Sequence, residues 1–200
     1  MKNIAILASG SGTNFQAIVK ARKKGIFKAN IKLLVTDTKN AFARQRARHL
    51  NISEIFVDPK KSKSRIDFDR EIVKLLKKEK IDYVILAGYM RLLSPIFVNA
   101  FKNKILNIHP ALLPSFKGIH SIKRAFEYGC KVTGVTVHLI DEKVDNGPIV
   151  LQESVRITKA TTLKSLESKI HKLEHELYPK AISLLVENRL KIRKRKVTFR

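Results

Sequence analysis

Asn107 and His109 stand at the end of the apolar run "KILNIHP" (residues 104–110), two positions apart and directly followed by Pro110. An imidazole can give or take a proton near neutral pH. An amide can donate a hydrogen bond to an oxygen that gains negative charge during attack on a carbonyl group. Pro110 opposes a helix at this point. The pair therefore predicts a reaction centre at the end of a buried strand.

Asp145, in "VDNGP", is the carboxylate that we expect to join this pair. It lies in the connection between two later β-rich runs and is predicted to fold over the same edge of the sheet. A carboxylate beside an imidazole favours the charged ring and so supports acid–base chemistry. No serine or cysteine nucleophile is needed if the substrate brings its own amine. Because an isolated histidine is usually structural, spacing alone leaves a structural role open for His109.

A second candidate site is the glycine-rich segment "SGSGTNFQAI" (residues 9–18), between the first apolar run and an amphipathic stretch. Its glycines allow close approach of backbone to a ligand, and a following helix would present free N–H groups to an anion. Phe15 stands where a dinucleotide fingerprint has its third glycine, and the Walker A ending is missing. The segment predicts a phosphate site, with a tight turn without a ligand as the alternative.

The apolar patterns predict the elements that position these residues. Strands are expected at residues 3–8, 31–36, 54–57, 82–88 and 104–108, with helices between them. That alternation predicts a parallel, doubly wound sheet, in which ligands bind beyond the carboxyl ends of the strands. Residues 132–140 and 148–157 predict an antiparallel pair, and a helix follows over about 162–188. The predicted fold class is α/β: one domain (1–200) with a Rossmann-like, mostly parallel sheet, helices on both faces and a C-terminal antiparallel strand pair.

Composition limits the classes of function. The 200 residues are 44% hydrophobic and 29% charged, which indicates a globular chain. No apolar run reaches the roughly 20 residues of a membrane span. The single cysteine, Cys130, excludes an internal disulfide and any multi-thiolate metal site. We expect a cytoplasmic protein.

The formal charge of +24 has two interpretations. It could mark a nucleic-acid partner. It could also be a lysine-rich composition spread over solvated helix faces, as in "KLLKKEK", which the scattered bases favour. The tail at residues 191–200, with six bases, could touch an anionic partner or remain solvated.

The motif "HKLEH" (residues 171–175) matches an inverted zinc-protease pattern. The same spacing also fits an ordinary polar helix face, which we favour, and no metal is expected. Glu174 falls on the apolar Ile170–Leu177 stripe and should point inward. A buried carboxylate needs a partner, either a ligand or one of the many lysines.

Together these segments resemble the phosphoribosylglycinamide formyltransferases, the folate-dependent enzymes of purine synthesis. The resemblance is carried, in order over nearly the whole chain, by "SGSGTNFQAI", "AFARQRAR", "SRIDFDREI", "LAGYMRLLSPIFV", "ILNIHPALLPSFKGIH", "VHLIDEKVDNGPIVLQ" and "EHELYP". It implies transfer of the formyl group of 10-formyltetrahydrofolate, a co-substrate, to the primary amine of N1-(5-phospho-D-ribosyl)glycinamide. The amine would attack directly, through a tetrahedral intermediate, without a metal.

The resemblance also implies a role for each matching residue. His109 would be the general acid, Asp145 would keep it charged, and Asn107 would hold the formyl oxygen. The residues that bind the ribonucleotide would be Gly12, Thr13, Asn14 and Glu174. The residues that bind the folate would be Arg65, Met90, Arg91, Leu92, Leu93 and Asn107. Ala111, Lys117 and Thr13 depart from the residues common in the family, which bears on fine loop contacts.

Related activities stay open as alternatives. A methionyl-tRNA formyltransferase resembles this family around "NIHPALLP", and the charge would suit it, but we expect no C-terminal RNA-binding domain in this chain. A formyltetrahydrofolate hydrolase usually resembles a longer chain. A non-catalytic basic protein would have no use for Asn107, His109 and Asp145. We expect small-molecule partners only, no nucleic acid or membrane, and a monomer or homodimer.

Overall fold

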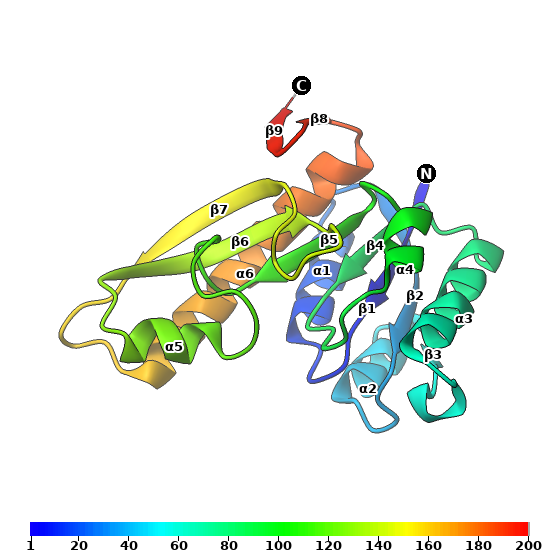
Figure 1. Ribbon diagram of the computed structural model, residues 1–200, viewed down its shortest axis with the longest axis horizontal. Coiled ribbons are helices and arrows are strands. Elements are labelled where there is room, and N and C mark those ends of the chain that lie inside the picture. The colour runs from blue at the N-terminus through cyan, green and yellow to red at the C-terminus, as the bar shows by residue number, and fades with distance from the viewer. Residues whose placement is uncertain (200) are drawn as a thin grey trace.

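The computed structural model, which describes residues 1–199, contains one seven-stranded sheet in the order β3-β2-β1-β4-β5-β6-β7 (Figure 1). The five parallel strands are β1 (Lys2–Leu7), β2 (Ala29–Thr36), β3 (Ser53–Phe56), β4 (Tyr83–Leu86) and β5 (Ile105–His109). The two antiparallel strands are β6 (Val132–Leu139) and β7 (Ile149–Arg156). The predicted fold class is confirmed. The chain leaves β1 in one direction and returns at β4 on its other side, so the switch point for ligand binding lies between these two strands.

Helices cover both faces of the sheet, as predicted (Figure 1). One face carries α1 (Thr13–Lys23), α2 (Phe42–His49), α5 (Ser121–Glu127) and α6 (Leu163–Val186). The other face carries α3 (Arg65–Lys78) and α4 (Pro95–Ala100), after a short 3-10 turn at Pro59–Lys61. The apolar stripe of α6 buries Leu166, Ile170 and Leu177 against the sheet, at the spacing that one helix face requires. The short helix α5 was not among the predicted elements.

The strands that deliver the candidate site are held in the centre of the sheet. All four residues of β4 are buried, because helices cover both of its faces. The hydroxyl of Tyr178, on α6, lies 2.8 Å from the carbonyl oxygen of Leu86 and 2.9 Å from that of Leu106. Helix α6 is thereby anchored to β4 and β5, next to the candidate catalytic residues Asn107 and His109.

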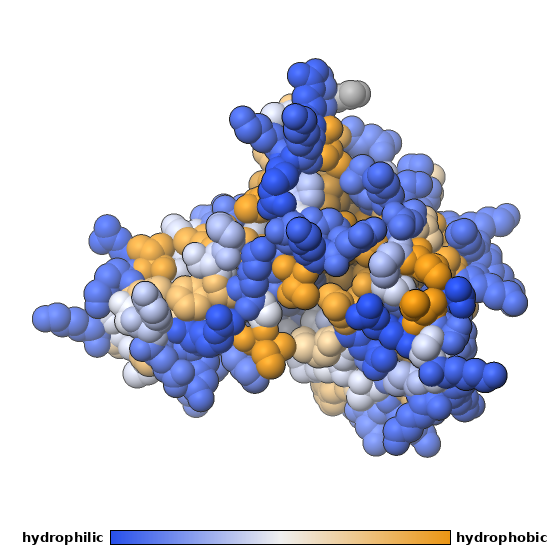
Figure 2. Space-filling model, viewed as in Figure 1, coloured by the Kyte–Doolittle hydropathy of each residue, from blue (hydrophilic) through white to orange (hydrophobic). Residues whose placement is uncertain are grey.

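The described part of the basic tail forms a hairpin. β8 (Leu190–Arg193) pairs antiparallel with β9 (Lys196–Phe199), apart from the main sheet in Figure 1. Leu190 and Ile192 pack against the core, whereas the lysine and arginine side chains are exposed. Figure 2 shows that hydrophilic side chains dominate the outer surface of this hairpin. None of the helices in residues 1–199 is long and apolar enough to cross a membrane.

Candidate active site

A cavity of about 800 Å³ lies at the carboxyl ends of the parallel strands. Its volume is within the roughly 300–1,000 Å³ of small-molecule sites. Among the described residues that line it are Gly12, Thr13, Asn14, Met90, Arg91, Leu92, Leu93, Asn107, His109, Asp145 and Glu174. Arg65, the first residue of α3, is exposed and lies outside this lining. The fold therefore brings together every predicted site residue except Arg65.

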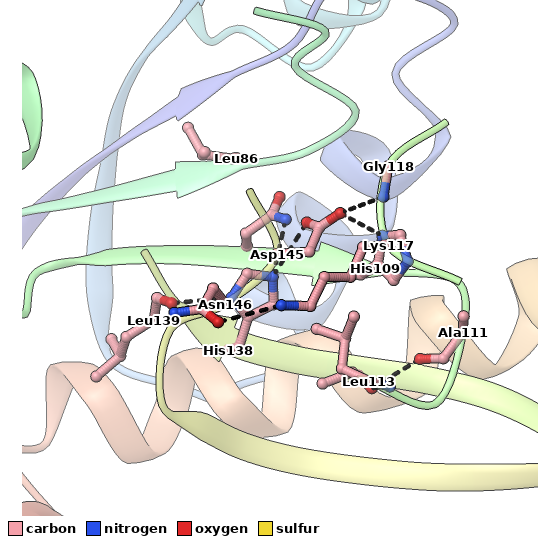
Figure 3. Close-up of polar contacts among 12 residues, drawn as sticks. Leu86, His109, Ala111, Leu113, Lys117, Gly118, His138, Leu139, Asp145 and Asn146 are labelled. Atoms are coloured by element: carbon pink, nitrogen blue, oxygen red, sulfur yellow. Dashed lines mark hydrogen bonds and ion pairs between the residues drawn. The ribbon is translucent and has the colours of Figure 1, made fainter. Parts of the chain in front are cut away.

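His109 is the last residue of β5, and its side chain is buried. Its Nε2 lies 2.9 Å from the carbonyl oxygen of Phe116. Its Nδ1 lies 3.4 Å from Oδ2 of Asp145, and Figure 3 shows these two side chains together. Both ring nitrogens thus face acceptors, an arrangement that a doubly protonated ring satisfies in full.

Burial opposes that charge. The pKa of His109 lies below its ordinary value because desolvation of the buried ring outweighs the attraction of Asp145 and the hydrogen bond to Phe116. The resemblance implies that Asp145 keeps the ring charged. In the structure the carboxylate only moderates the loss of charge, so the neutral imidazole is favoured at neutral pH.

Asp145 folds over the sheet edge from the β6–β7 connection, where it adopts a left-handed backbone conformation with φ 44°. The N–H of Gly118 donates to its Oδ2 at 2.8 Å, and its Oδ1 lies 3.6 Å from Nε2 of His138. Burial raises the pKa of Asp145, but His138, the Gly118 N–H and His109 together hold it below its ordinary value. The carboxylate is therefore ionised beside His109.

Two of the sequence departures, Ala111 and Lys117, lie in the loop between β5 and α5. Lys117 donates through Nζ to Oδ1 of Asn146 at 3.1 Å, which ties the loop before α5 to the β6–β7 connection. Ala111 is buried, and its carbonyl accepts from the hydroxyl of Thr136 at 2.7 Å. Figure 3 shows Lys117 and Gly118 close to Asp145.

His138 is a site residue that the sequence analysis missed. It is fully buried on β6, opposite Asn107. Its Nδ1 lies 2.9 Å from the carbonyl oxygen of Leu139, and its Nε2 lies 3.1 Å from Nδ2 of Asn107. The second N–H of that amide stays available to an oxygen in the cavity. A histidine in the β-rich run "VTGVTVHL" was the signal in the sequence.

Glu174 points inward, as its position on the apolar stripe predicts, and is 4% exposed. Its Oε2 accepts from Nδ2 of Asn14 at 3.2 Å and lies 2.9 Å from Nδ1 of His171. The partners of this carboxylate are therefore an amide and an imidazole, not a lysine. Because both contacts use Oε2, Oε1 is available to a ligand in the cavity.

The "HKLEH" motif thus supplies a hydrogen-bonded pair. The hydrogen bond from His171 to Glu174 raises the pKa of the imidazole above its ordinary value. Within residues 1–199, no three histidine, cysteine or acidic side chains are placed to hold a metal ion.

The glycine loop (residues 9–14) runs from the end of β1 into α1. Gly12 precedes the helix with φ 74°, a conformation that glycine adopts without steric cost. Thr13 and Asn14 are the first two helical residues, so their N–H groups have no partners within the helix. Oδ1 of Asn14 is buried and has no partner in the described part of the chain. The loop therefore presents unpaired polar groups to the cavity.

Residues 90–93 form the apolar wall on the other side of the cavity. Met90 is 72% exposed and Leu92 46% exposed, whereas Leu93 is buried. The guanidinium of Arg91 stacks 4.8 Å from the centre of the Phe68 ring. Such a surface suits the ring system of a ligand, with a cation close to it.

Known proteins match the chain over most of its length. The model of the family described as formyl transferase matches residues 2–182. The phosphoribosylglycinamide formyltransferase of Bacillus subtilis (strain 168) is 41% identical over 186 residues, covering 93% of this chain and 95% of that protein. The enzyme of the same name from Haemophilus influenzae is 37% identical and covers 96% and 91%. The crystal structure of glycinamide ribonucleotide transformylase 1 from Symbiobacterium toebii superposes with a TM-score of 0.97 at 41% identity, covering 100% and 94%. The chain belongs to the formyl transferase family.

Proposed function

We propose that this chain is a phosphoribosylglycinamide formyltransferase of purine (IMP) biosynthesis, acting as one domain. It transfers the formyl group of 10-formyltetrahydrofolate to the primary amine of N1-(5-phospho-D-ribosyl)glycinamide. The observation that carries this proposal is that one cavity joins Asn107, His109 and Asp145 to both the glycine loop and the apolar wall. The names of its relatives support the same reaction.

The two substrates have distinct places in this proposal. The ribonucleotide phosphate binds the N–H groups of the glycine loop and the start of α1. The carboxylate of Glu174 accepts from the glycinamide through its uncommitted Oε1. The folate ring lies on the apolar wall, whose exposed Met90 and Leu92 it would cover. Arg65, outside the cavity, can meet only a part of the folate that extends beyond the cavity.

The reaction needs no nucleophile from the protein. The substrate amine attacks the formyl carbon, and the second N–H of Asn107 stabilises the negative charge that develops on the formyl oxygen. The bond between that carbon and the folate nitrogen then breaks. One proton leaves the attacking amine and one arrives at the folate nitrogen, so the reaction is balanced.

We propose that His109 and Asp145 carry out the proton transfer from the amine to the folate nitrogen. The neutral imidazole can accept a proton from the attacking amine, and the adjacent carboxylate stabilises the imidazolium while it exists. His138 acts through Asn107, whose amide it orients.

The experiment is a spectrophotometric assay of the purified protein with both substrates, together with the His109→Ala variant. We expect turnover that requires both substrates and falls at least about a hundredfold in the variant, the lower limit for lost acid–base catalysis. The matched control is His49→Ala, an exposed histidine on α2 that contacts the Gln45 carbonyl. Deformylation without the ribonucleotide would indicate a hydrolase. Formylation of methionyl-tRNA instead would overturn the proposal in favour of the nucleic-acid alternative.

A further inference from the structure

Helix α2 contacts three successive residues of the glycine loop, although it does not line the cavity. The N–H of Ala43 donates to the carbonyl oxygen of Gly10 at 3.1 Å. The Nε of Arg46 donates to the carbonyl oxygen of Ser11 at 2.9 Å. Gly12 packs so closely that a Cβ placed on it would lie 2.7 Å from the Cβ of Ala43. The helix therefore determines how the loop is oriented.

Peptide geometry determines the direction of the N–H groups in this loop. In a trans peptide the C=O of one residue and the N–H of the next point in opposite directions. Since the carbonyls of Gly10 and Ser11 are held toward α2, the N–H groups of Ser11 and Gly12 point away from it, and both residues line the cavity. Neither N–H has an acceptor in the described part of the protein. Two successive unpaired N–H groups with a fixed direction form a concavity for an anion.

The guanidinium of Arg46 is held in place by several contacts. Besides Ser11, its guanidinium donates to Oε1 of Gln16 on α1, and it stacks 4.8 Å from the centre of the Phe42 ring. The other two arginines of the helix, Arg44 and Arg48, pair with Glu54 instead.

We propose that Arg46 is a positioning residue for phosphate recognition: its guanidinium holds the Ser11 carbonyl and so aims the Gly12 N–H at the ribonucleotide phosphate. This inference rests on the proposed function. Arg46 lies outside the cavity lining, so it would act through the loop and not on a substrate directly. Its effect is therefore confined to one of the two substrates.

The test compares Arg46→Ala, Arg46→Lys and Arg48→Ala. Arg48→Ala removes the same charge from the same helix without touching the loop. In Arg46→Ala we expect KM for glycinamide ribonucleotide to rise about tenfold, the order expected when a hydrogen bond from a charged donor is lost. The turnover number and KM for the folate stay within about twofold, since only the loop is disturbed. Arg46→Lys keeps the charge but not the planar guanidinium, so it recovers only part of the affinity. Arg48→Ala behaves as wild type.

Binding of inorganic phosphate, measured by calorimetry and as protection against thermal unfolding, separates this inference from the reaction. We expect phosphate to stabilise the wild type and Arg48→Ala more than Arg46→Ala. That result would support the role of Arg46 even if the wild type transferred no formyl group, which would overturn only the proposed reaction. Equal effects of Arg46→Ala and Arg48→Ala would show that only the positive charge of α2 matters, and would overturn the inference. So would a loss in Arg46→Ala that appears equally for both substrates. If Arg46→Ala fails to fold, Arg46→Lys decides the same question.

Discussion

The glycine loop and the apolar wall face each other across one cavity but are built in different ways. They follow neighbouring strands, β1 and β4, and are joined through Ser9, whose N–H donates to the Gly88 carbonyl and whose Oγ accepts from the Met90 N–H. The loop presents backbone N–H groups and packs tightly on α2. The wall presents side chains, of which Met90 and Leu92 are exposed.

The difference reflects what each side has to recognise. A backbone N–H binds an anion only if its peptide unit is fixed, so the loop needs support on the side away from the ligand. An apolar surface binds a ring through contact area, which depends little on the direction of any one group. We therefore expect substitutions in the loop to have larger effects than those in the wall, and each to affect one substrate.

The largest effect is expected for Gly12→Ala. Alanine at φ 74° is strained, and its Cβ would lie 2.8 Å from the Cα of Ala43, which cannot move without shifting α2. We expect kcat/KM for the ribonucleotide to fall about a hundredfold, the equivalent of roughly 2.7 kcal/mol. Steady-state kinetics with each substrate varied in turn would measure it.

Gly25→Ala is the control, because it places alanine at a similar φ of 77°, outside the cavity lining and with no atom within 4 Å of its Cβ. That variant should keep most of the activity. Equal losses in both variants would show that the support from α2 is unimportant.

The backbone of the wall depends on Asp69, so its removal should produce the next largest effect. Asp69 is 1% exposed, and its Oδ2 accepts from the N–H of Ser94 at 2.5 Å. Asp69→Ala leaves that N–H unpaired and should raise KM for 10-formyltetrahydrofolate about tenfold. Asp69→Asn keeps an acceptor oxygen and should recover most of the loss. A similar rise in KM for the ribonucleotide would contradict the separation of the two sides.

A side chain of the wall should matter less. Leu92→Ala removes an apolar group that is 46% exposed and that the folate would cover. KM for the folate should rise about fivefold, close to 1 kcal/mol of apolar contact, while KM for the ribonucleotide stays constant. Ile66→Ala, which removes a side chain that is 40% exposed outside the cavity lining, is the matched control. If both variants behave alike, the wall is not the folate surface.

The smallest effect concerns pH on the loop side. The hydrogen bond to Glu174 raises the pKa of His171, so its imidazolium is fully present below the ordinary value of 6.5 and is lost as pH rises through the raised value. A partly exposed cation contributes modestly. Ribonucleotide binding, measured by calorimetry, should therefore weaken about two- to threefold over this rise, while folate binding stays unchanged. His171→Gln should bind the ribonucleotide without this pH dependence; an unchanged slope would assign it to another group.

The outline of the fold was predictable from local patterns. The alternation of apolar runs with amphipathic stretches predicted the parallel part of the sheet, and the two β-rich runs predicted the antiparallel pair. The position of Glu174 on an apolar stripe predicted its burial. Helix α5 was missed because it is short and has no long apolar periodicity. The basic tail gave no sign of a hairpin, which depends on packing Leu190 and Ile192 against the core.

The sequence by itself determined which chemistry was present: an amide, an imidazole and a carboxylate, with a glycine-rich turn before a helix. Only the tertiary structure decided what these groups meet. Strand register placed His138 against Asn107. Helix α2, which is distant in the chain from the glycine-rich turn, holds the carbonyl groups of that turn. Burial, which no single segment contains, outweighs the attraction of Asp145 and lowers the pKa of His109, because the cost of a charge depends on everything that surrounds it.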